Sequence, residues 1–446
     1  MVGIGEIWEA IVLGRGCVGL LAKTPRGTED VLPKESRIWQ HIECQLAQIF
    51  SLFGYKEIRT PIFEETELFQ RGIGEATDIV EKEMYTFTDR AGRSLTLRPE
   101  GTAPVVRAYL QHKLYGEPQP IKLWYVGPMF RYERPQAGRS RQFHQYGAEA
   151  LGTQDPATDA EMIAIPVELF RRLGLDTVQV EINSIGCPQC RGGYQEYLIE
   201  TLKPKADQLC GDCQRRLQKN PLRILDCKNA VCNSIKTGLK SILDFLCPEC
   251  SDHFESVQGY LDLLQIPYVI NHNLVRGFDY YTKTVFEITY SELGAQSAIA
   301  GGGRYDGLVE ECGGPSVPAV GFAAGMERLL LTLEHRGWEP PTKETIDVFI
   351  AGVGETRSAV VELAFCLRRA GLAAEMDYGD RSLRAQMKTA NRLNAAWTII
   401  VGEDELRDNK AVVRHMASGR QEEVAIAKLE GWLREQVRTG CRGTKE

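Results

Sequence analysis

Two features are missing from this sequence: a long apolar run and an excess of positive charge. No apolar stretch is long enough to span a bilayer as a helix, so we expect no membrane-embedded segment. The formal net charge is −7, which argues against a generally basic coat for nucleic acid. Nucleic-acid binding stays open, because phosphate contacts need only a local basic surface. No internal repeat is evident.

The first 23 residues contain an apolar stretch without the pattern of a secretion signal. Glu6 and Glu9 stand where a signal peptide has lysine or arginine, and Arg15 splits the apolar stretch. We interpret residues 1–23 as an N-terminal extension and expect the protein to be cytoplasmic.

The composition is that of a globular protein, with 43% hydrophobic and 25% charged residues, so long disordered tracts are not expected. A chain of 446 residues is too long for a single compact core. Two or three domains are therefore predicted.

Periodicity predicts the elements of the first third of the chain. Residues 34–53 have helical spacing of apolar side chains, and residues 54–64 resemble a strand that Pro61 interrupts, as at a sheet edge or an interface. Residues 84–151 are predicted to be mostly antiparallel strand.

One helix is expected within that stretch, with Thr102 at its N-cap and Pro104 in its first turn. Two strands follow, at 122–133 and 142–151, joined by a polar loop that is too long for a tight hairpin.

The rest of the chain divides by composition. Residues 186–264 are predicted to be a helical insertion within a core that spans 24–335, and residues 336–346 are a linker. In residues 347–446, short apolar strands alternate with helical segments, which predicts a small α/β domain with a largely parallel sheet.

The strand pair at 122–133 and 142–151 carries polar side chains on one face. Side chains of equal parity share a strand face, which groups Arg131 with Glu133, and Gln145 with Gly147 and Glu149. The loop between the strands adds three cations, Arg134, Arg139 and Arg141. Arginine binds phosphate oxygens bidentately and keeps its charge, so this face suits a nucleotide phosphate beside a small zwitterionic substrate. A solvated strand face with ordinary ion pairs is the alternative.

Two other stretches carry side chains that could bind a substrate. Glu100 lies between a strand and a helix, where a carboxylate can meet an ammonium group, and Gly101 would let a ligand approach the backbone. In "RGFDYYT", Arg276 stands beside Tyr280 and Tyr281. A solvated turn or ordinary aromatic packing explains each place equally well in isolation. The glycine-rich stretches "AGGGRYDGL" and "GFAAGMERLLL" are weak evidence alone, because tight packing also requires glycine.

Taken together, these stretches resemble one family. "GPMFRYERPQAGRSRQFHQYGAE" is similar to motif 2 of class II aminoacyl-tRNA synthetases (about 122–150), "AVGFAAGMERLLL" to motif 3 (about 318–333) and "IRTPIFEE" to motif 1 (about 57–64). "RGFDYYT", "GGGRYDGL" and "RPEGTA" are similar to segments of histidyl-tRNA synthetases. The resemblance extends from about residue 24 to 433.

The resemblance implies a role for each matched residue. Arg276 and Arg131 correspond to catalytic arginines on the α-phosphate of ATP, and Arg139 and Arg328 to further ATP-binding residues. The implied histidine-binding set is Glu100, Gly101, Thr102, Gln145, Glu149, Tyr280 and Tyr281. In the loop, Arg134 and Gln136 correspond to residues that face the tRNA acceptor end.

The implied fold is α/β and multidomain: a class II antiparallel sheet flanked by helices, a helical insertion and a C-terminal anticodon-binding domain. The implied reaction joins L-histidine to tRNA(His) with ATP and Mg²⁺, through a histidyl-adenylate and release of pyrophosphate. Motif 1 implies a homodimer. Basic residues of the C-terminal domain, Arg381, Arg384, Lys388 and Arg392, are candidates for tRNA contact, with a solvated helix face as the alternative.

Two other functions are open to a chain of this kind. One is a non-catalytic regulatory subunit of ATP phosphoribosyltransferase, and the other is an RNA-binding or sensing module. Such regulatory paralogues lose active-site residues and the C-terminal domain, whereas this sequence has Arg131, Arg276, Arg328 and the segment from Asp347 onward. The enzyme is therefore favoured.

Thirteen cysteines are many for a cytoplasmic protein, and eight lie between residues 187 and 250. Clustering in Cys-x-x-Cys pairs favours metal ligation over disulfides. The eight are candidates for one or two structural Zn²⁺ ions, distant from the reaction chemistry: Cys187, Cys190, Cys210, Cys213, Cys227, Cys232, Cys247 and Cys250. Buried reduced cysteines are the alternative, and the resemblance does not decide between them.

The segment 72–87, with glycine hinges at 72 and 74, is predicted to close over substrate.

Overall fold

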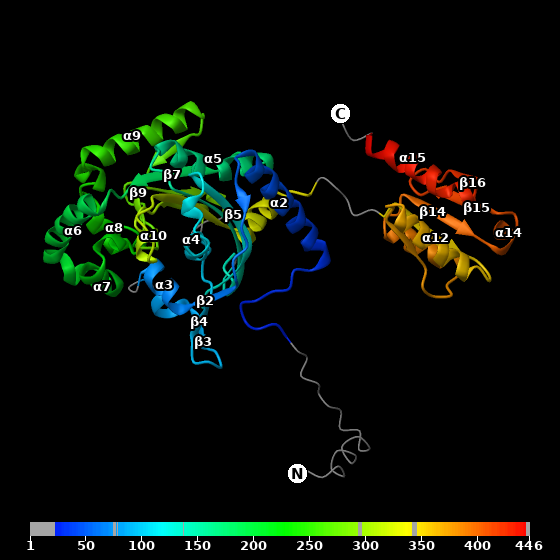
Figure 1. Ribbon diagram of the computed structural model, residues 1–446, viewed down its shortest axis with the longest axis horizontal. Coiled ribbons are helices and arrows are strands. Elements are labelled where there is room, and N and C mark those ends of the chain that lie inside the picture. Colours follow the sequence, from blue (N-terminus) through cyan, green and yellow to red (C-terminus); the bar gives the residue numbers. More distant parts are fainter. Residues whose placement is uncertain are drawn as a thin grey trace, which may run out of the picture. The chain divides into compact units, whose positions relative to one another are not determined.

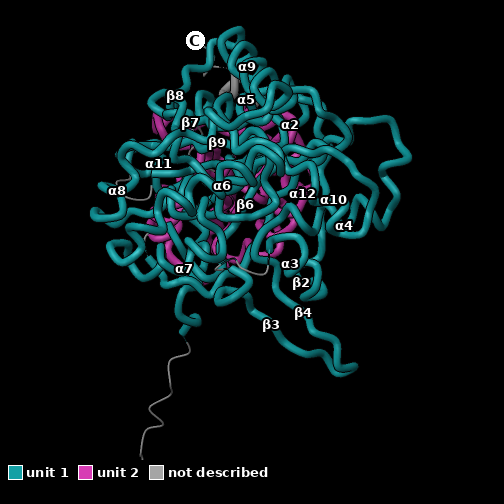
Figure 2. The backbone as a smooth tube through the Cα atoms, turned by 90° about the vertical axis from the view of Figure 1, so that its left-hand side faces the viewer, with its two compact units in different colours: residues 1–339 teal, residues 340–446 magenta. Residues whose placement is uncertain are grey.

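The computed structural model describes residues 23–74, 77, 79–136, 138–292, 297–340 and 346–442. The chain forms two compact units, residues 1–339 and 340–446, which are coloured separately in Figure 2. The N-terminal extension predicted at 1–23 lies outside the described residues except for Lys23. Among the helices of the described chain, none is both long enough and apolar enough to cross a membrane.

Unit 1 is built on an eight-stranded sheet with the order β1-β5-β6-β11-β10-β9-β7-β8. Its strands are β1 (Lys56–Glu57), β5 (Ile121–Phe130), β6 (Gln142–Leu151), β7 (Gln179–Ser184), β8 (Tyr268–Ile270), β9 (Thr282–Thr289), β10 (Ala298–Arg304) and β11 (Ala319–Gly325). The inner pairings are antiparallel, as predicted, and only the outermost pairs, β1–β5 and β7–β8, are parallel.

One face of this sheet is covered by helices and holds the main hydrophobic core (Figure 1). The covering helices are α2 (Pro33–Leu52), α5 (Pro156–Arg172), α9 (Pro248–Leu263) and α11 (Met326–His335). The helical spacing predicted at 34–53 is confirmed, since Ile42, Leu46 and Ile49 are buried in this core.

The predicted strand at 54–64 is broken at Pro61, and its halves join different sheets. β1 pairs at the edge of the large sheet, while β2 (Phe63–Glu65) belongs to a three-stranded sheet with β3 (Tyr85–Thr88) and β4 (Ser94–Leu97). Helices α3 (Thr66–Ile73), α4 (Thr102–Gln111) and α10 (Leu308–Glu311) complete this part, together with a π-helical turn at Ile79–Glu83 and a 3-10 turn at Leu114–Gly116.

The start of α4 differs from the prediction by one residue. Gly101 is the N-cap, and Thr102 is the first helical residue. The capping acceptor is the carboxylate of Glu100, which accepts hydrogen bonds from the backbone N–H groups of Thr102 at 2.7 Å and Ala103 at 2.8 Å. Because that acid satisfies two free N–H groups of the first turn, no side chain at the cap itself is needed. Pro104 lies in the first turn, as predicted.

The insertion predicted at 186–264 consists of helices and 3-10 turns joined by short loops. It comprises α6 (Pro188–Leu202), α7 (Gly211–Lys219), α8 (Ala230–Lys236), α9, and 3-10 turns at Lys203–Gln208, Pro221–Ile224 and Ile242–Phe245. α6, α7 and α8 gather at one end of unit 1 (Figure 1).

Unit 2 has a five-stranded sheet with the order β13-β12-β14-β15-β16. Its elements are β12 (Val348–Gly352), α12 (Arg357–Arg369), β13 (Ala374–Met376), α13 (Leu383–Arg392), β14 (Trp397–Val401), α14 (Glu403–Arg407), β15 (Lys410–His415), β16 (Gln421–Ala425), a 3-10 turn at Ile426–Lys428 and α15 (Leu429–Arg442). The first three strands are parallel, as predicted, but β15 and β16 are antiparallel. The prediction of a largely parallel sheet was wrong for these two strands, and the short turn that joins β15 to β16 permits only antiparallel pairing of that pair.

Candidate functional site

The centre of the large sheet lacks side chains on the face opposite the main core. Gly301 of β10 lies opposite Ala323 of β11, and Gly321 and Gly325 follow on the same face of β11. Cross-strand partners in an antiparallel sheet project to the same side, so these residues leave a hollow above the sheet. They line a cavity of about 540 Å³.

Most of the residues singled out in the sequence surround this cavity. Those that line it are Glu100, Thr102, Arg131, Arg139, Gln145, Arg276, Tyr280, Tyr281 and Arg328. They come from segments far apart in the chain, and the sheet brings them together. Gly101 and Glu149 lie beneath or beside the wall, and Arg134 and Gln136 are exposed on the loop outside it.

Glu149 is fully buried under the floor of the cavity. Its carboxylate accepts hydrogen bonds from Thr102 Oγ1 at 2.8 Å, from Tyr125 Oη at 3.3 Å and from Tyr305 Oη. Burial raises the pKa of Glu149 to about 8, against the opposing effect of these hydroxyl donors. A Cβ atom at residue 321 would lie 1.7 Å from the carboxylate, so glycine is required there.

The glycine at 101 has a packing reason that the sequence did not indicate. A Cβ atom at this position would lie 2.2 Å from the ring of Tyr125, so Gly101 makes room for that ring, and the approach of a ligand to its backbone stays a prediction. The same ring covers Gly147, where a Cβ would lie 2.6 Å from the tyrosine hydroxyl oxygen. Both glycines therefore serve to seat Tyr125 beside Glu149.

An aromatic group forms one wall. The ring of Tyr280 stacks on Phe278 with centroids 5.1 Å apart, and lies 4.7 Å from Tyr281 and 5.6 Å from Tyr305. Burial raises the pKa of Tyr280 and of Tyr281, so both phenols are neutral hydrogen-bonding groups at physiological pH.

Arg276 lies across the bare backbone of Gly301, where a Cβ would be 2.6 Å from both Nη atoms. Its Nη1 donates to Glu287 Oε1 at 2.6 Å. Burial opposes the charge, but Glu287 and then Tyr281 outweigh it and raise the pKa of Arg276. Arg276 Nε and Gln145 Oε1 are buried without a hydrogen-bond partner among the described residues. A donor and an acceptor are thus still to be satisfied in the cavity.

Three further arginines form the cationic part of the site. Arg131 follows the last residue of β5 instead of lying on the strand, and its Nε donates to Pro99 O at 2.8 Å. Arg139 and Arg131 approach Glu133 at 3.2 and 3.7 Å. Arg328 donates to Ala298 O at 2.6 Å, and burial followed by the charge of Arg139 lowers its pKa. Several positive charges held this close are stabilised by a polyanionic ligand.

Four residues of the site were not predicted from the sequence: Tyr125, Tyr305, Glu287 and Gly301. Strand parity was a usable signal for Tyr125, because it shares a face with Arg131. Tyr305 stands in a quoted glycine-rich stretch. Gly301 stands in the same stretch, whereas nothing local distinguishes Glu287, which matters through its contact with Arg276.

The segment predicted to close over the cavity starts at the end of α3. Gly74 has φ of +100°, and a Cβ there would lie 2.9 Å from the carboxylate of Asp279. Ile79, farther along, lines the cavity. Residues 75, 76 and 78 lie outside the described residues, and closure stays a prediction.

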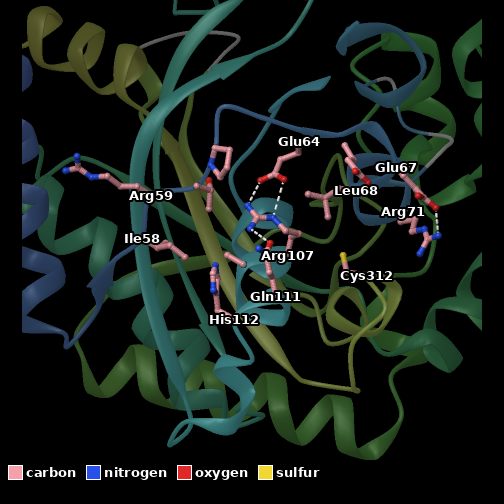
Figure 3. Close-up of a pocket in the computed structure, with 14 residues that line it drawn as sticks. Ile58, Arg59, Glu64, Glu67, Leu68, Arg71, Arg107, Gln111, His112 and Cys312 are labelled. Carbon is pink, nitrogen blue, oxygen red and sulfur yellow. Dashed lines mark hydrogen bonds and ion pairs between the residues drawn. The ribbon is translucent and has the colours of Figure 1, made fainter. Parts of the chain in front are cut away.

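A second hollow, of about 730 Å³, is drawn in Figure 3 and shares no described lining residue with this cavity. Its walls come from the stretch around Pro61, from α3 and from α4. Figure 3 shows Arg107 turned toward Glu64, with Nε 3.2 Å from Oε2, and Gln111 accepting from the same guanidinium at 3.1 Å. Arg107 is thus paired with Glu64 and Gln111, and the predicted histidine, ATP and tRNA residues are absent from the described lining of this hollow.

In unit 2, Arg384, Lys388 and Arg392 are exposed at helical spacing along α13. Arg381 precedes the helix and is paired with Asp377, its Nε lying 2.6 Å from Oδ1. The basic stretch therefore presents one exposed helix face.

Two family models match this sequence. The model described as histidyl-tRNA synthetase matches residues 27–189 and 216–329, and the anticodon-binding domain model matches residues 347–436. The chain belongs to the histidyl-tRNA synthetase family.

Individual members of the family are similar over nearly the whole chain. The histidine–tRNA ligase of Halothermothrix orenii is 57% identical over 408 residues, covering 91% of this chain and 97% of the relative. That of Desulforamulus reducens is 55% identical over 414 residues, covering 92% and 98%. The apo crystal structure of S. aureus histidyl-tRNA synthetase has a TM-score of 0.80 at 43% identity and covers 93% of this chain and all of that one.

A solved protein from Bacillus halodurans described as an ATP phosphoribosyltransferase regulatory subunit/histidyl-tRNA synthetase is also similar. It has a TM-score of 0.59 at 22% identity, covering 86% of this chain and 98% of that one, and this likeness shows the fold alone. The predicted fold class and family are confirmed. The regulatory subunit is not favoured.

Proposed function

We propose that this chain ligates L-histidine to tRNA(His) in two steps. ATP and histidine first give histidyl-adenylate and pyrophosphate, and the histidyl group then passes to the 3′-terminal ribose of the tRNA. The observation that carries the proposal is the composition of one cavity, which is lined by a buried acid and two buried phenols, Glu100, Tyr280 and Tyr281, together with four arginines, and has Glu149 buried under its floor. Such a cavity suits an amino acid beside a nucleotide phosphate.

In the first step the histidine carboxylate attacks the α-phosphorus of ATP and pyrophosphate leaves. Negative charge develops on the phosphoryl oxygens, and fixed guanidinium groups stabilise it most where water is excluded. Arg276 and Arg131 are assigned to the α-phosphate, with Arg139 and Arg328 on the rest of the nucleotide. Family members use ATP with Mg²⁺, and the ion enters here as part of the substrate. The Glu287 carboxylate keeps Arg276 in place against Gly301.

Histidine is assigned to the acidic and phenolic side. Gln145 Oε1, which is buried and still lacks a donor, is suited to the substrate ammonium group, together with Glu100 and Thr102. Glu149 and Tyr281 are assigned to the imidazole nitrogens. The three hydroxyls on Glu149 use three of about four positions around its carboxyl oxygens, and the fourth is left for the ring, as a donor while Glu149 carries its proton and as an acceptor once it is ionised. A substrate without ring nitrogens leaves buried polar groups unmatched, which supports discrimination of about 10⁴–10⁵ without editing.

The tRNA is assigned to two exposed regions. Arg134 and Gln136 are exposed on the loop that also carries Arg139, as a contact with the acceptor end requires. The match of residues 347–436 to the anticodon-binding domain, and the exposed cations of α13, support anticodon contact by unit 2. A cytoplasmic location accords with work on tRNA.

A homodimer is proposed through the motif 1 stretch. Ile62 is 45% exposed, Phe63 51% and Phe87 44%, and the two phenylalanine rings contact one another with centroids 6.3 Å apart. Exposed apolar side chains grouped in this way favour a protein contact. Light scattering of wild type and Phe63→Asp tests the assignment: a dimer that becomes a monomer supports it, and a wild-type monomer contradicts it.

Histidine-dependent exchange of labelled pyrophosphate into ATP, without tRNA, tests the first step. Exchange specific for histidine among the amino acids supports adenylate formation, and tRNA charging then tests the second step. Folded protein supplied with Mg²⁺ that shows no exchange contradicts the proposal. The regulatory-subunit alternative is weakened by the four arginines of the cavity and by the second unit, which matches the anticodon-binding domain model.

A further inference from the structure

The eight cysteines of the insertion form two separate groups of four thiols. One tetrad joins the first Cys-x-x-Cys pair to the last: Cys187, Cys190, Cys247 and Cys250. The other joins the two middle pairs: Cys210, Cys213, Cys227 and Cys232. Within each tetrad all four sulfur atoms lie within 4.8 Å of one another.

The spacing of the sulfur atoms fits a tetrahedral ion. Zinc–thiolate bonds of about 2.3 Å place the sulfurs of a tetrahedral site about 3.8 Å apart. Cys187 Sγ and Cys190 Sγ are 3.5 Å apart, and Cys210 Sγ and Cys227 Sγ are 3.8 Å apart. A disulfide would require about 2.05 Å, and all eight thiols are free.

Local structure aims the thiols inward. Cys187, Cys210 and Cys247 are the N-cap residues of α6, α7 and α9, so each pair straddles the start of a helix. Backbone N–H groups point at sulfur in both tetrads, from Cys247 to Cys190 Sγ at 3.1 Å and from Cys210 to Cys232 Sγ at 3.3 Å. Such N–H donors stabilise thiolate ligands. Sites with four sulfurs in this arrangement select zinc, or iron in clusters.

The first tetrad adjoins the segment that carries Tyr280 and Tyr281. Arg191, one helical turn after Cys187, donates from Nη1 to the carbonyl oxygens of Asp279 and Tyr281, both at 3.1 Å. Glu249, between the two cysteines of the last pair, accepts from Lys283 Nζ at 2.8 Å. The tetrad thus joins α6 and α9 close to the side chains by which both helices bond to residues 279–283.

Residues between the cysteines of the second tetrad form hydrogen bonds to the same segment. Between Cys213 and Cys227, Asn220 Nδ2 donates to Asp279 Oδ1 at 2.8 Å and Arg223 Nη1 donates to Gly277 O at 2.9 Å. The residues on either side of Cys227, Asp226 and Lys228, line the cavity. Cys227 therefore lies between two residues of the cavity wall, and the distance of the cysteines from the reaction chemistry stays a prediction.

We propose that each tetrad binds one structural Zn²⁺, and that the two ions hold the insertion against residues 276–283 and so set the affinity for histidine. The α7 and α8 helices have nine and seven residues, too few to be stable by themselves, and the ions supply the missing cross-links. The effect on histidine rests on the proposed function, whereas the metal sites do not.

Metal analysis of the purified full-length chain tests the sites. We expect two zinc ions per chain in the wild type, one in Cys250→Ser, one in Cys232→Ser and none in the double variant. Cys366→Ser, which alters an exposed cysteine of unit 2, is the matched control and keeps two. Wild-type protein that contains no zinc above background, or iron in its place, overturns the assignment.

Arg191→Gln tests the positioning role without removing a ligand. It is expected to keep two zinc ions and to raise the KM for histidine in pyrophosphate exchange by about tenfold or more, with less change in the KM for ATP. Arg191→Lys should restore part of the affinity, and Arg215→Gln, which alters an exposed arginine paired within α7, should change nothing. An unchanged histidine KM in Arg191→Gln overturns the positioning role. A wild-type chain with two zinc ions and no exchange refutes the proposed function and leaves the metal sites standing.

Discussion

The guanidinium of Arg276 lies flat against Gly301 on β10, and no side chain larger than hydrogen fits between them. The contact joins two segments whose role the sequence alone left open: the arginine beside two tyrosines, and the run of glycines. Glu287, paired in register with Gly301 on β9, completes the arrangement by holding Nη1 of the arginine. The run of glycines is explained at this position by the arginine it accommodates.

Gly301→Ala should therefore impair the chemical step. The methyl group would displace the guanidinium from the place where charge develops, and loss of one such donor typically lowers kcat by about 10²–10³-fold. Pyrophosphate exchange at saturating histidine and ATP measures the effect. Gly259→Ala is the control, because nothing lies within 4 Å of a Cβ there. Normal exchange by Gly301→Ala would contradict the role given to Arg276.

Arg276→Lys should lower kcat strongly while histidine affinity stays nearly intact, because lysine keeps the charge but cannot present two parallel N–H groups. Histidine binding by calorimetry and exchange kinetics separate the two effects. A large loss of histidine binding would instead place Arg276 among the binding residues.

The double variant Arg276→Lys/Gly301→Ala should be little worse than Arg276→Lys alone. Both substitutions act on one guanidinium, so their effects on exchange should not add. Fully additive losses would show that Gly301 acts through some other contact.

Stability should respond to pH through Glu149. Its pKa is about 8 in the folded protein against 4.5 as the ordinary value, so the native state retains a proton that the unfolded chain releases. The stability contributed by this carboxyl is fully present below its unfolded pKa and is lost as pH rises through about 8. The Tm of unit 1 in the wild type should thus fall relative to that of Glu149→Gln between about pH 5 and 8. Calorimetry at several pH values measures this, and parallel curves would contradict the buried, proton-bearing carboxyl.

A buried ion pair on the opposite side of the sheet should matter for stability alone. Asp159 and Arg304 are both fully buried and bonded to each other, and His253 of α9 lies 3.3 Å from the same carboxylate. Asp159→Ala should destabilise unit 1 by about 3–5 kcal/mol, since it removes the fully buried carboxylate from a buried arginine and leaves it only the partly exposed Asp306 at 3.2 Å. Asp176→Ala, at an exposed site, should stay within about 0.5 kcal/mol. Urea unfolding compares them, and equal midpoints would contradict this account.

Local patterns in the sequence were sufficient for several elements. Apolar spacing located α2, and parity placed Gln145 and Glu149 on one face of β6, where the register of the strands confirms it. Pro61 marked the break between β1 and β2. The start of α4 was predicted one residue late, because the capping carboxylate of Glu100 is two residues from the first N–H it satisfies.

By itself the sequence determined the family, the order of elements and the residue types at the cavity, since motifs and periodicity are local properties. Only the tertiary structure decided which distant residues meet: Arg276 with Gly301, Tyr125 with Gly101, and the first cysteine pair with the fourth. These contacts depend on strand register and helix packing, which bring together residues separated by many positions in the chain, and no pattern within a single segment specifies them.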